Sequence, residues 1–162
     1  MRIVSILENQ KVEKRIAITP DIAKKYIALG FEISIVENYG NHLGFKDSDY
    51  KELGAEISNN KSEILNSADI IVQLGLLQDE NLSSLRENQM LIGVFNPYDN
   101  KEKIENLVKK NISIFSLEML PRITRAQSMD ILSSQANLAG YKAVIESFAN
   151  FEKAIPMMMT AA

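Results

Sequence analysis

Cysteine is absent from the 162 residues of the chain. This absence excludes disulfide bonds, thiolate zinc sites and a cysteine nucleophile, and it suits a reducing compartment such as the cytoplasm. Histidine occurs once, as His42, between Gly40 and Gly44 in an expected turn. Because no second histidine accompanies it, His42 lacks the partners that a zinc site needs. We therefore predict no metal site and assign His42 no function.

The chain also lacks a strong charge of one sign and long apolar runs. Its 18 basic and 21 acidic residues give a net charge of −3, and the basic residues are scattered. Nucleic acid is therefore not an expected partner. Charged or polar residues interrupt every apolar run before the roughly 18 residues that a membrane span requires. The first residues, MRIVSILEN, contain no signal-peptide pattern. We expect neither export nor direct membrane insertion.

Glycine is scarce and irregularly placed. The seven glycines contain no G-x-G-x-x-G, so the fingerprint that binds dinucleotide phosphates is absent. No Gly/Ser-rich or Pro-rich linker and no fixed-period repeat divides the sequence.

Short apolar runs rich in Val, Ile and Phe alternate with helical patterns along the chain. The predicted strands are Ile3–Leu7, Ile33–Val36, Ile70–Leu74, Met90–Phe95 and Ile112–Leu117. The predicted helices are Pro20–Leu29, Asp47–Leu53, Lys61–Leu65, Glu80–Leu85 and Asn100–Lys109. This alternation predicts an α/β fold: a doubly wound, mostly parallel sheet in a Rossmann- or flavodoxin-like sandwich, with ligands at the carboxyl ends of the strands.

The alternation of strand and helix patterns ends in the last part of the chain. A long helical pattern runs from about Met129 to Lys153 and ends near Pro156. We therefore expect an α/β domain over residues 1–128, followed over residues 129–162 by a long helix and a connector to a second domain.

Two segments carry groups that could bind a ligand. The first, EKRIAITP, places Lys14 and Arg15 in the loop that leaves the first strand, where either a solvated loop or a ligand contact is expected. The second lies at residues 121–145. There Thr124 and Gln127 have capping-box spacing, and Ser128 and Asp130 also suit the start of a helix.

Hydrogen-bonding side chains are unusually dense in this second segment. Arg122, Arg125, Gln127 and Asp130 fall close together between a strand and a helix. An arginine can bind a carbonyl or a phosphate, and a glutamine can donate and accept at once, so this set suits a carboxamide ligand. Helix capping and surface exposure explain the same residues equally well.

The sequence RITRAQSMDILSSQANLAGYKAVI, with PMMMTAA after it, closely resembles the signature of the NAD(H)-binding component of proton-translocating NAD(P) transhydrogenases. EKRIAITP resembles the opening that this family shares with alanine dehydrogenases. The resemblance covers all 162 residues. It implies the N-terminal part of the NAD(H)-binding alpha subunit, whose glycine-rich domain would begin soon after MMMTAA. We therefore expect a truncated product that binds NADH weakly by itself.

The resemblance also implies a site and a reaction. Arg122, Gln127, Asp130 and Ser133 would bind NAD(H) beside its nicotinamide ring, with Gln127 and Asp130 as the catalytic positions. Hydride would pass directly between NAD(H) and NADP(H), the latter held on a partner component, and a membrane component would couple this transfer to proton movement. The family further implies a homodimer in the cytoplasm, peripheral to the inner membrane through its partner subunits.

Two alternatives remain open. An alanine dehydrogenase of this family uses a lysine near residue 73 and a histidine near residue 96, where this chain has Gln73 and Asn96. Those replacements disfavour alanine dehydrogenase chemistry. The other alternative is a non-enzymatic interaction module that docks through Met157–Met159 at the end of the long helix.

Overall fold

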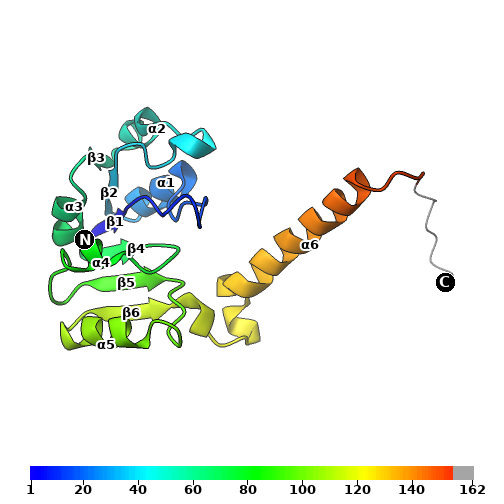
Figure 1. Cartoon of the computed structure of the whole chain (residues 1–162). Coiled ribbons are helices and arrows are strands. Elements are labelled where there is room, and N and C mark those ends of the chain that lie inside the picture. The colour runs from blue at the N-terminus through cyan, green and yellow to red at the C-terminus, as the bar shows by residue number, and fades with distance from the viewer. Residues whose placement is uncertain (155–162) are drawn as a thin grey trace. The chain divides into compact units, whose positions relative to one another are not determined.

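The structure of the chain is a computed structural model, and it describes residues 1–154. It consists of two compact units, Met1–Met119 and Leu120–Ala162 (Figure 1). The second unit is described as far as residue 154, so Met157–Met159 lie outside the described residues. Its long helix ends at Ala149, four residues before the predicted end at Lys153. The predicted boundary at residues 128 and 129 stays a prediction.

The first unit is built on a parallel sheet of six strands in the order β3-β2-β1-β4-β5-β6. The strands are β1 (Arg2–Ser5), β2 (Glu32–Val36), β3 (Glu56–Ser58), β4 (Ile70–Val72), β5 (Met90–Gly93) and β6 (Ser113–Ser116). This is the order of a doubly wound nucleotide-binding sheet, which confirms the predicted fold class. The apolar runs did not predict β3, a three-residue edge strand with one apolar residue, Ile57.

Five helices accompany the sheet: α1 (Pro20–Ala28), α2 (Asp47–Glu52), α3 (Lys61–Ser67), α4 (Asp79–Leu82) and α5 (Lys101–Lys109). The strand order runs one way from β1 to β3 and the opposite way from β4 to β6. Because crossovers between parallel strands are right-handed, α1 and α2 belong to one face and α3, α4 and α5 to the other. Contacts of α1 with α2 and of α3 with α4 agree with this division.

Local signals explain where α1 begins and ends. The Thr19 side chain accepts a hydrogen bond from the Ile22 amide, and Pro20 occupies the first turn, where no amide hydrogen is required. Beyond the helix, Gly30 has a φ of 88°, a left-handed conformation that glycine adopts without strain. The sequence pattern predicted both ends of this helix to within one residue.

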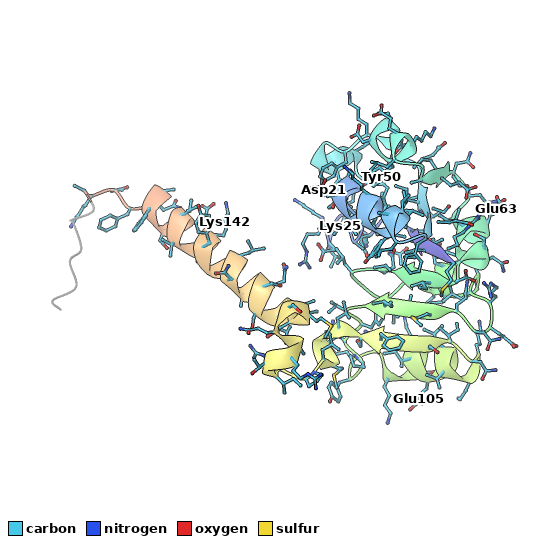
Figure 2. The ribbon with its side chains drawn as sticks, turned by 180° about the vertical axis from the view of Figure 1, so that it is seen from behind. Asp21, Lys25, Tyr50, Glu63, Glu105 and Lys142 are labelled. Atoms are coloured by element: carbon cyan, nitrogen blue, oxygen red, sulfur yellow. The ribbon has the colours of Figure 1, made fainter. Side chains whose placement is uncertain are left out.

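The core lies between the sheet and its helices. Apolar side chains of the strands, such as Val4, Ile35 and Leu91, are fully buried. Tyr39 and Tyr50 are also fully buried and meet edge to face, with ring centroids 6.1 Å apart. Figure 2 shows Glu105 directed outward from α5, in keeping with an apolar interior and a charged surface.

The second unit contains a short 3-10 helix, η3 (Thr124–Met129), followed by α6 (Ile131–Ala149). Thr124 lies inside η3, and no side chain caps this helix, so the capping-box spacing of Thr124 and Gln127 is not used. Asp130, which was also expected to suit a helix start, is the N-cap of α6, and its carboxylate accepts the Ser133 amide at 3.0 Å. Within residues 1–154, no helix is both long enough and apolar enough to cross a membrane.

Candidate functional site

A chain of buried hydrogen bonds runs across the carboxyl ends of β2, β1 and β4. The amides of Ala17 and Ile18 donate to the Tyr39 hydroxyl at 3.0 and 3.1 Å, and that hydroxyl lies 2.7 Å from Ser5 Oγ. Ser5 Oγ donates its one hydrogen to Gln73 Oε1 at 2.9 Å, so it must accept the hydrogen bond that the Tyr39 hydroxyl donates. Burial raises the pKa of Tyr39. The hydroxyl therefore stays a donor, and the chain has a fixed direction.

Glu8 extends this chain into the loop after β4. Its Oε1 accepts from Gln73 Nε2 at 3.1 Å and from the amides of Leu74 and Gly75 at 2.6 and 3.3 Å. Partial burial raises the pKa of Glu8, and the Leu74 and Gly75 amides oppose this rise because they stabilise the carboxylate. One carboxylate thus holds the ends of β1 and β4 together.

The raised pKa of Glu8 leads to a prediction about pH. Between the ordinary carboxyl pKa of 4.5 and the higher value in the folded chain, the folded state binds more protons than the unfolded state. The free energy of unfolding therefore falls as pH rises through this window, and it stays lowered above the window. Glu8→Gln keeps an oxygen acceptor without the charge, so we expect the slope in this window to shrink and stability at neutral pH to be maintained or raised.

Urea unfolding between pH 4 and pH 8 would measure this effect. Glu8→Leu serves as the contrasting variant, because it leaves three donors without their acceptor and should cost about 2 kcal/mol at every pH. An unchanged slope in Glu8→Gln would mean that another group causes the pH dependence.

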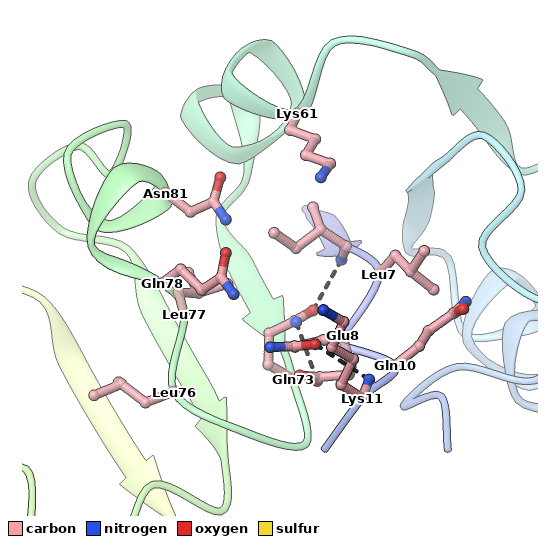
Figure 3. A pocket seen from close by; sticks show the side chains of 12 residues that line it. Leu7, Glu8, Gln10, Lys11, Lys61, Gln73, Leu76, Leu77, Gln78 and Asn81 are labelled. Carbon is pink, nitrogen blue, oxygen red and sulfur yellow. Dashed lines mark hydrogen bonds between the residues drawn. The ribbon is translucent and has the colours of Figure 1, made fainter. Parts of the chain in front are cut away.

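A cleft of about 550 Å³ opens where the strand order reverses, between the loops that follow β1 and β4 (Figure 3). The loop after β1 contributes Glu8 and Lys11, α3 contributes Lys61, and α4 contributes Asn81. In doubly wound sheets this reversal is where ligands bind. The predicted position of a site, at the carboxyl ends of the strands, therefore coincides with an actual cleft.

The loop residues chosen from the sequence have mainly local partners. Arg15 forms an ion pair with Glu13, with 2.6 Å between Nη2 and Oε2. His42 Nε2 lies 2.7 Å from the Lys14 carbonyl oxygen, and His42 Nδ1 lies 3.1 Å from Gln10 Nε2. His42 thus fastens the loop after β1 to the turn around residue 42. The contacts of His42 are thus structural ones.

The predicted nicotinamide residues lie together in the second unit. Arg122 donates from Nε to Asp130 Oδ2 at 3.4 Å and from Nη2 to Ser133 Oγ at 2.9 Å. Ser133 Oγ donates to Asp130 Oδ2 at 2.7 Å. The hydroxyl and amide of Ser133 are the main causes that lower the pKa of Asp130, and Arg122 adds to the effect. Asp130 is therefore a carboxylate that fixes both an arginine and the first turn of α6.

Gln127 lies beside this network. Arg122, Gln127 and Asp130 line a hollow of about 280 Å³, and Gln127, Asp130 and Ser133 line a second of about 300 Å³. Gln127 is exposed, and its carboxamide has no hydrogen-bond partner among the described residues. Arg125 is also exposed and forms no ion pair within residues 1–154. The network therefore unites Arg122, Asp130 and Ser133, with Gln127 free at its edge.

Three polar residues of the first unit were not predicted from the sequence: Tyr39, Asn81 and, in its actual role, Gln73. The sequence marks Gln73 only as the replacement of a lysine, whereas its side chain is 2% exposed and bridges β1 to β4. A polar residue directly after the apolar run of β4 was an available signal, because buried strand ends need partners for their polar groups.

Comparison with known proteins agrees with this geometry. Residues 6–139 match the family model described as alanine dehydrogenase/PNT, N-terminal domain. Over its whole length the chain is 43% identical to the first part of NAD(P) transhydrogenase subunit alpha from Rickettsia prowazekii, and 38% identical to its counterpart from Rhodospirillum rubrum. It spans 43% and 44% of the lengths of these two relatives.

A solved structure of transhydrogenase from Sinorhizobium meliloti superimposes with a TM-score of 0.85 at 36% identity, over 98% of this chain and 48% of the other. Both the sheet and the sequence are thus shared with transhydrogenase subunits. Because the family model covers most of the sequence, the chain belongs to the alanine dehydrogenase/PNT N-terminal domain family, as a domain of the kind found in transhydrogenase alpha subunits.

Proposed function

We propose that the chain forms the N-terminal domain of the NAD(H)-binding component of a proton-translocating transhydrogenase and positions the nicotinamide for hydride transfer between NAD(H) and NADP(H). The observation that carries this proposal is the fixed Arg122, Asp130 and Ser133 network with the unpaired carboxamide of Gln127 beside it. The likeness to transhydrogenase alpha subunits along the whole chain supports the same reaction.

The side chains present suit a carboxamide ligand such as nicotinamide. Gln127 can donate to and accept from a carboxamide at once, which gives a paired, orientation-specific contact. Arg122 uses Nε and Nη2 for Asp130 and Ser133, and its remaining N–H groups can donate to a carbonyl oxygen. The Arg122 side chain is 65% exposed, so a ligand can reach these donors.

The proposed roles follow from these contacts. NAD(H), when bound, supplies or accepts the hydride, and no side-chain nucleophile is required. Gln127 and Arg122 bind the carboxamide and fix the orientation of the ring. Asp130 and Ser133 hold Arg122 in place, so Asp130 acts as a positioning residue. Accurate placement of two reacting groups is itself a large part of such a rate enhancement.

The complete assembly belongs to the same proposal. NADP(H) would be held on a partner component, and a membrane component would couple the reaction to proton movement. The NAD(H)-binding component would act as a homodimer in the cytoplasm, peripheral to the membrane.

The alanine dehydrogenase alternative is disfavoured by Gln73, which stands near the position of the lysine in that branch. Gln73 is buried, its carboxamide oxygen accepts from Ser5 and Ile6, and its nitrogen donates to Glu8, so both ends of the carboxamide already have partners.

Titration of the isotope-labelled chain with NADH, followed by nuclear magnetic resonance, would test the proposal. We expect the signals of the Gln127 carboxamide and the Arg122 Nε–H to shift in a saturable manner. Arg122→Ala should weaken binding about tenfold, because one charge-assisted hydrogen bond is lost. Lys142→Ala is the control: it removes an exposed cation from α6, about 18 Å along the helix axis from Asp130, and should leave the affinity unchanged. NADH binding that leaves residues 122–133 undisturbed would refute the proposed site.

A further inference from the structure

The cleft at the reversal of the strand order shares no lining residue with the proposed nicotinamide site. It lies wholly in the first unit, and none of its lining residues belongs to residues 122–133. Its volume of about 550 Å³ is within the range of small-molecule sites, roughly 300–1,000 Å³. Leu76 and Leu77 give it an apolar wall.

Asn81 is the unexplained polar group of the cleft. The residue is 9% exposed, and its carboxamide forms no hydrogen bond with any described residue. Figure 3 shows the Asn81 side chain directed from α4 toward the open space of the cleft. Most of the residue is buried, but its carboxamide atoms are open to the cleft and are not among the buried side-chain atoms that lack a partner. Its donors and acceptor are therefore available to a ligand.

The charged side chains that line the cleft indicate the charge of the ligand that it would bind. Lys11 and Lys61 both line it and form no ion pair with the described residues. Glu8 is the one carboxylate in the lining, and the Leu74 and Gly75 amides and Gln73 already bond to it. Two unpaired ammonium groups against one hydrogen-bonded carboxylate leave the cleft with a net positive charge. An anionic group is the complement of this arrangement.

We propose that this cleft is a second ligand site, which binds a small organic anion. The carboxylate or phosphate of that anion would lie between Lys11 and Lys61, a polar group would bond to the Asn81 carboxamide, and an apolar portion would lie against Leu76 and Leu77. The site follows from the geometry of the first unit alone, so it stands whether or not the chain takes part in hydride transfer.

Titration of the isotope-labelled chain with succinate, and separately with inorganic phosphate, at constant ionic strength would test this site. We expect a saturable shift of the Asn81 carboxamide signals with at least one of the two probes, and the stronger response identifies the anionic group. Asn81→Leu should weaken binding of that probe about tenfold, because the ligand loses a hydrogen-bond partner in the cleft. Lys61→Ala, an exposed substitution, should weaken it by a few-fold without affecting the fold.

Lys24→Ala on α1 is the matched control, since it removes an exposed lysine outside the cleft and should have no effect on either titration. Three outcomes would overturn the proposal: no saturable shift with either probe, a shift that sodium chloride reproduces, or affinities that Lys61→Ala and Asn81→Leu both leave unchanged. NADH binding at residues 122–133 is measured independently, so failure of one site leaves the other to be judged by itself.

Discussion

Asp130→Asn in the complete transhydrogenase is expected to slow hydride transfer about a hundredfold while the domain stays folded. Asparagine caps a helix about as well as aspartate, so the Ser133 amide keeps its acceptor and α6 keeps its start. The negative charge that holds the Arg122 guanidinium is lost, and so is an acceptor of the Ser133 hydroxyl. Arg122 is then free to leave the geometry that the carboxamide requires. Stopped-flow measurement of a single turnover would give the rate directly.

Glu146→Gln provides the control for this experiment. It also neutralises a carboxylate of α6 paired with a cation, Lys142, but lies more than three turns from Asp130. We expect its rate to equal that of the unmodified enzyme. A comparable loss in both variants would show that α6 responds to charge in general. An unchanged rate in Asp130→Asn would remove Asp130 from the site.

Gln127→Leu should also reduce the rate of hydride transfer. The Gln127 side chain forms no hydrogen bond within residues 1–154, so the substitution should leave the fold intact.

The largest effect on stability is expected for Gln73→Leu, at about 3 kcal/mol. The substitution conserves approximate size but leaves the buried Ile6 amide without the acceptor it has at 2.8 Å. Ser5 loses its acceptor and Glu8 loses a donor at the same time. For a chain of this length the loss corresponds to about 6–12 °C in the midpoint of thermal unfolding. Calorimetry or urea unfolding would measure it.

The control for Gln73→Leu is Gln78→Leu. Gln78 lines the same cleft, but it is exposed and its side chain makes no cap hydrogen bond to α4. Its replacement should change the free energy of unfolding by less than about 0.5 kcal/mol. Equal effects of the two substitutions would mean that added apolar surface in the cleft, and not the lost hydrogen bonds, determines stability.

The sequence predicted the sheet well because five of its strands are apolar runs that stand out from their surroundings. β3 was missed because an edge strand of three residues with alternating exposure carries almost no periodic signal. The exact start of the long helix stayed open for a different reason. Thr124, Gln127, Ser128 and Asp130 all suit a helix start, and local preference alone does not choose among them. The choice depends on the Arg122 and Ser133 contacts of Asp130.

The candidate site was predictable in part. The dense set of hydrogen-bonding residues in RITRAQSMD drew attention to Arg122, Gln127 and Asp130, and the structure does bring Arg122, Asp130 and Ser133 into contact. Asn81 was not predictable, because it sits in an ordinary polar helix and becomes unusual only through its burial at a cleft that the loop after β1 and α3 also line. A single sequence gives little information about contacts between residues that are far apart along the chain.

The junction of β1 with β4 also has a consequence for how the first unit folds. Within the described residues, these two strands form the one pairing between the β1 to β3 half and the β4 to β6 half, and they pair over two positions, Ile3 with Ile70 and Val4 with Ile71. Each half can form from neighbouring segments, whereas this seam must bring together residues 67 positions apart, as in the Arg2 amide bond to Asp69. We therefore expect this seam to form late in folding, with the Asp69 and Gln73 side chains stabilising the two halves once they are paired.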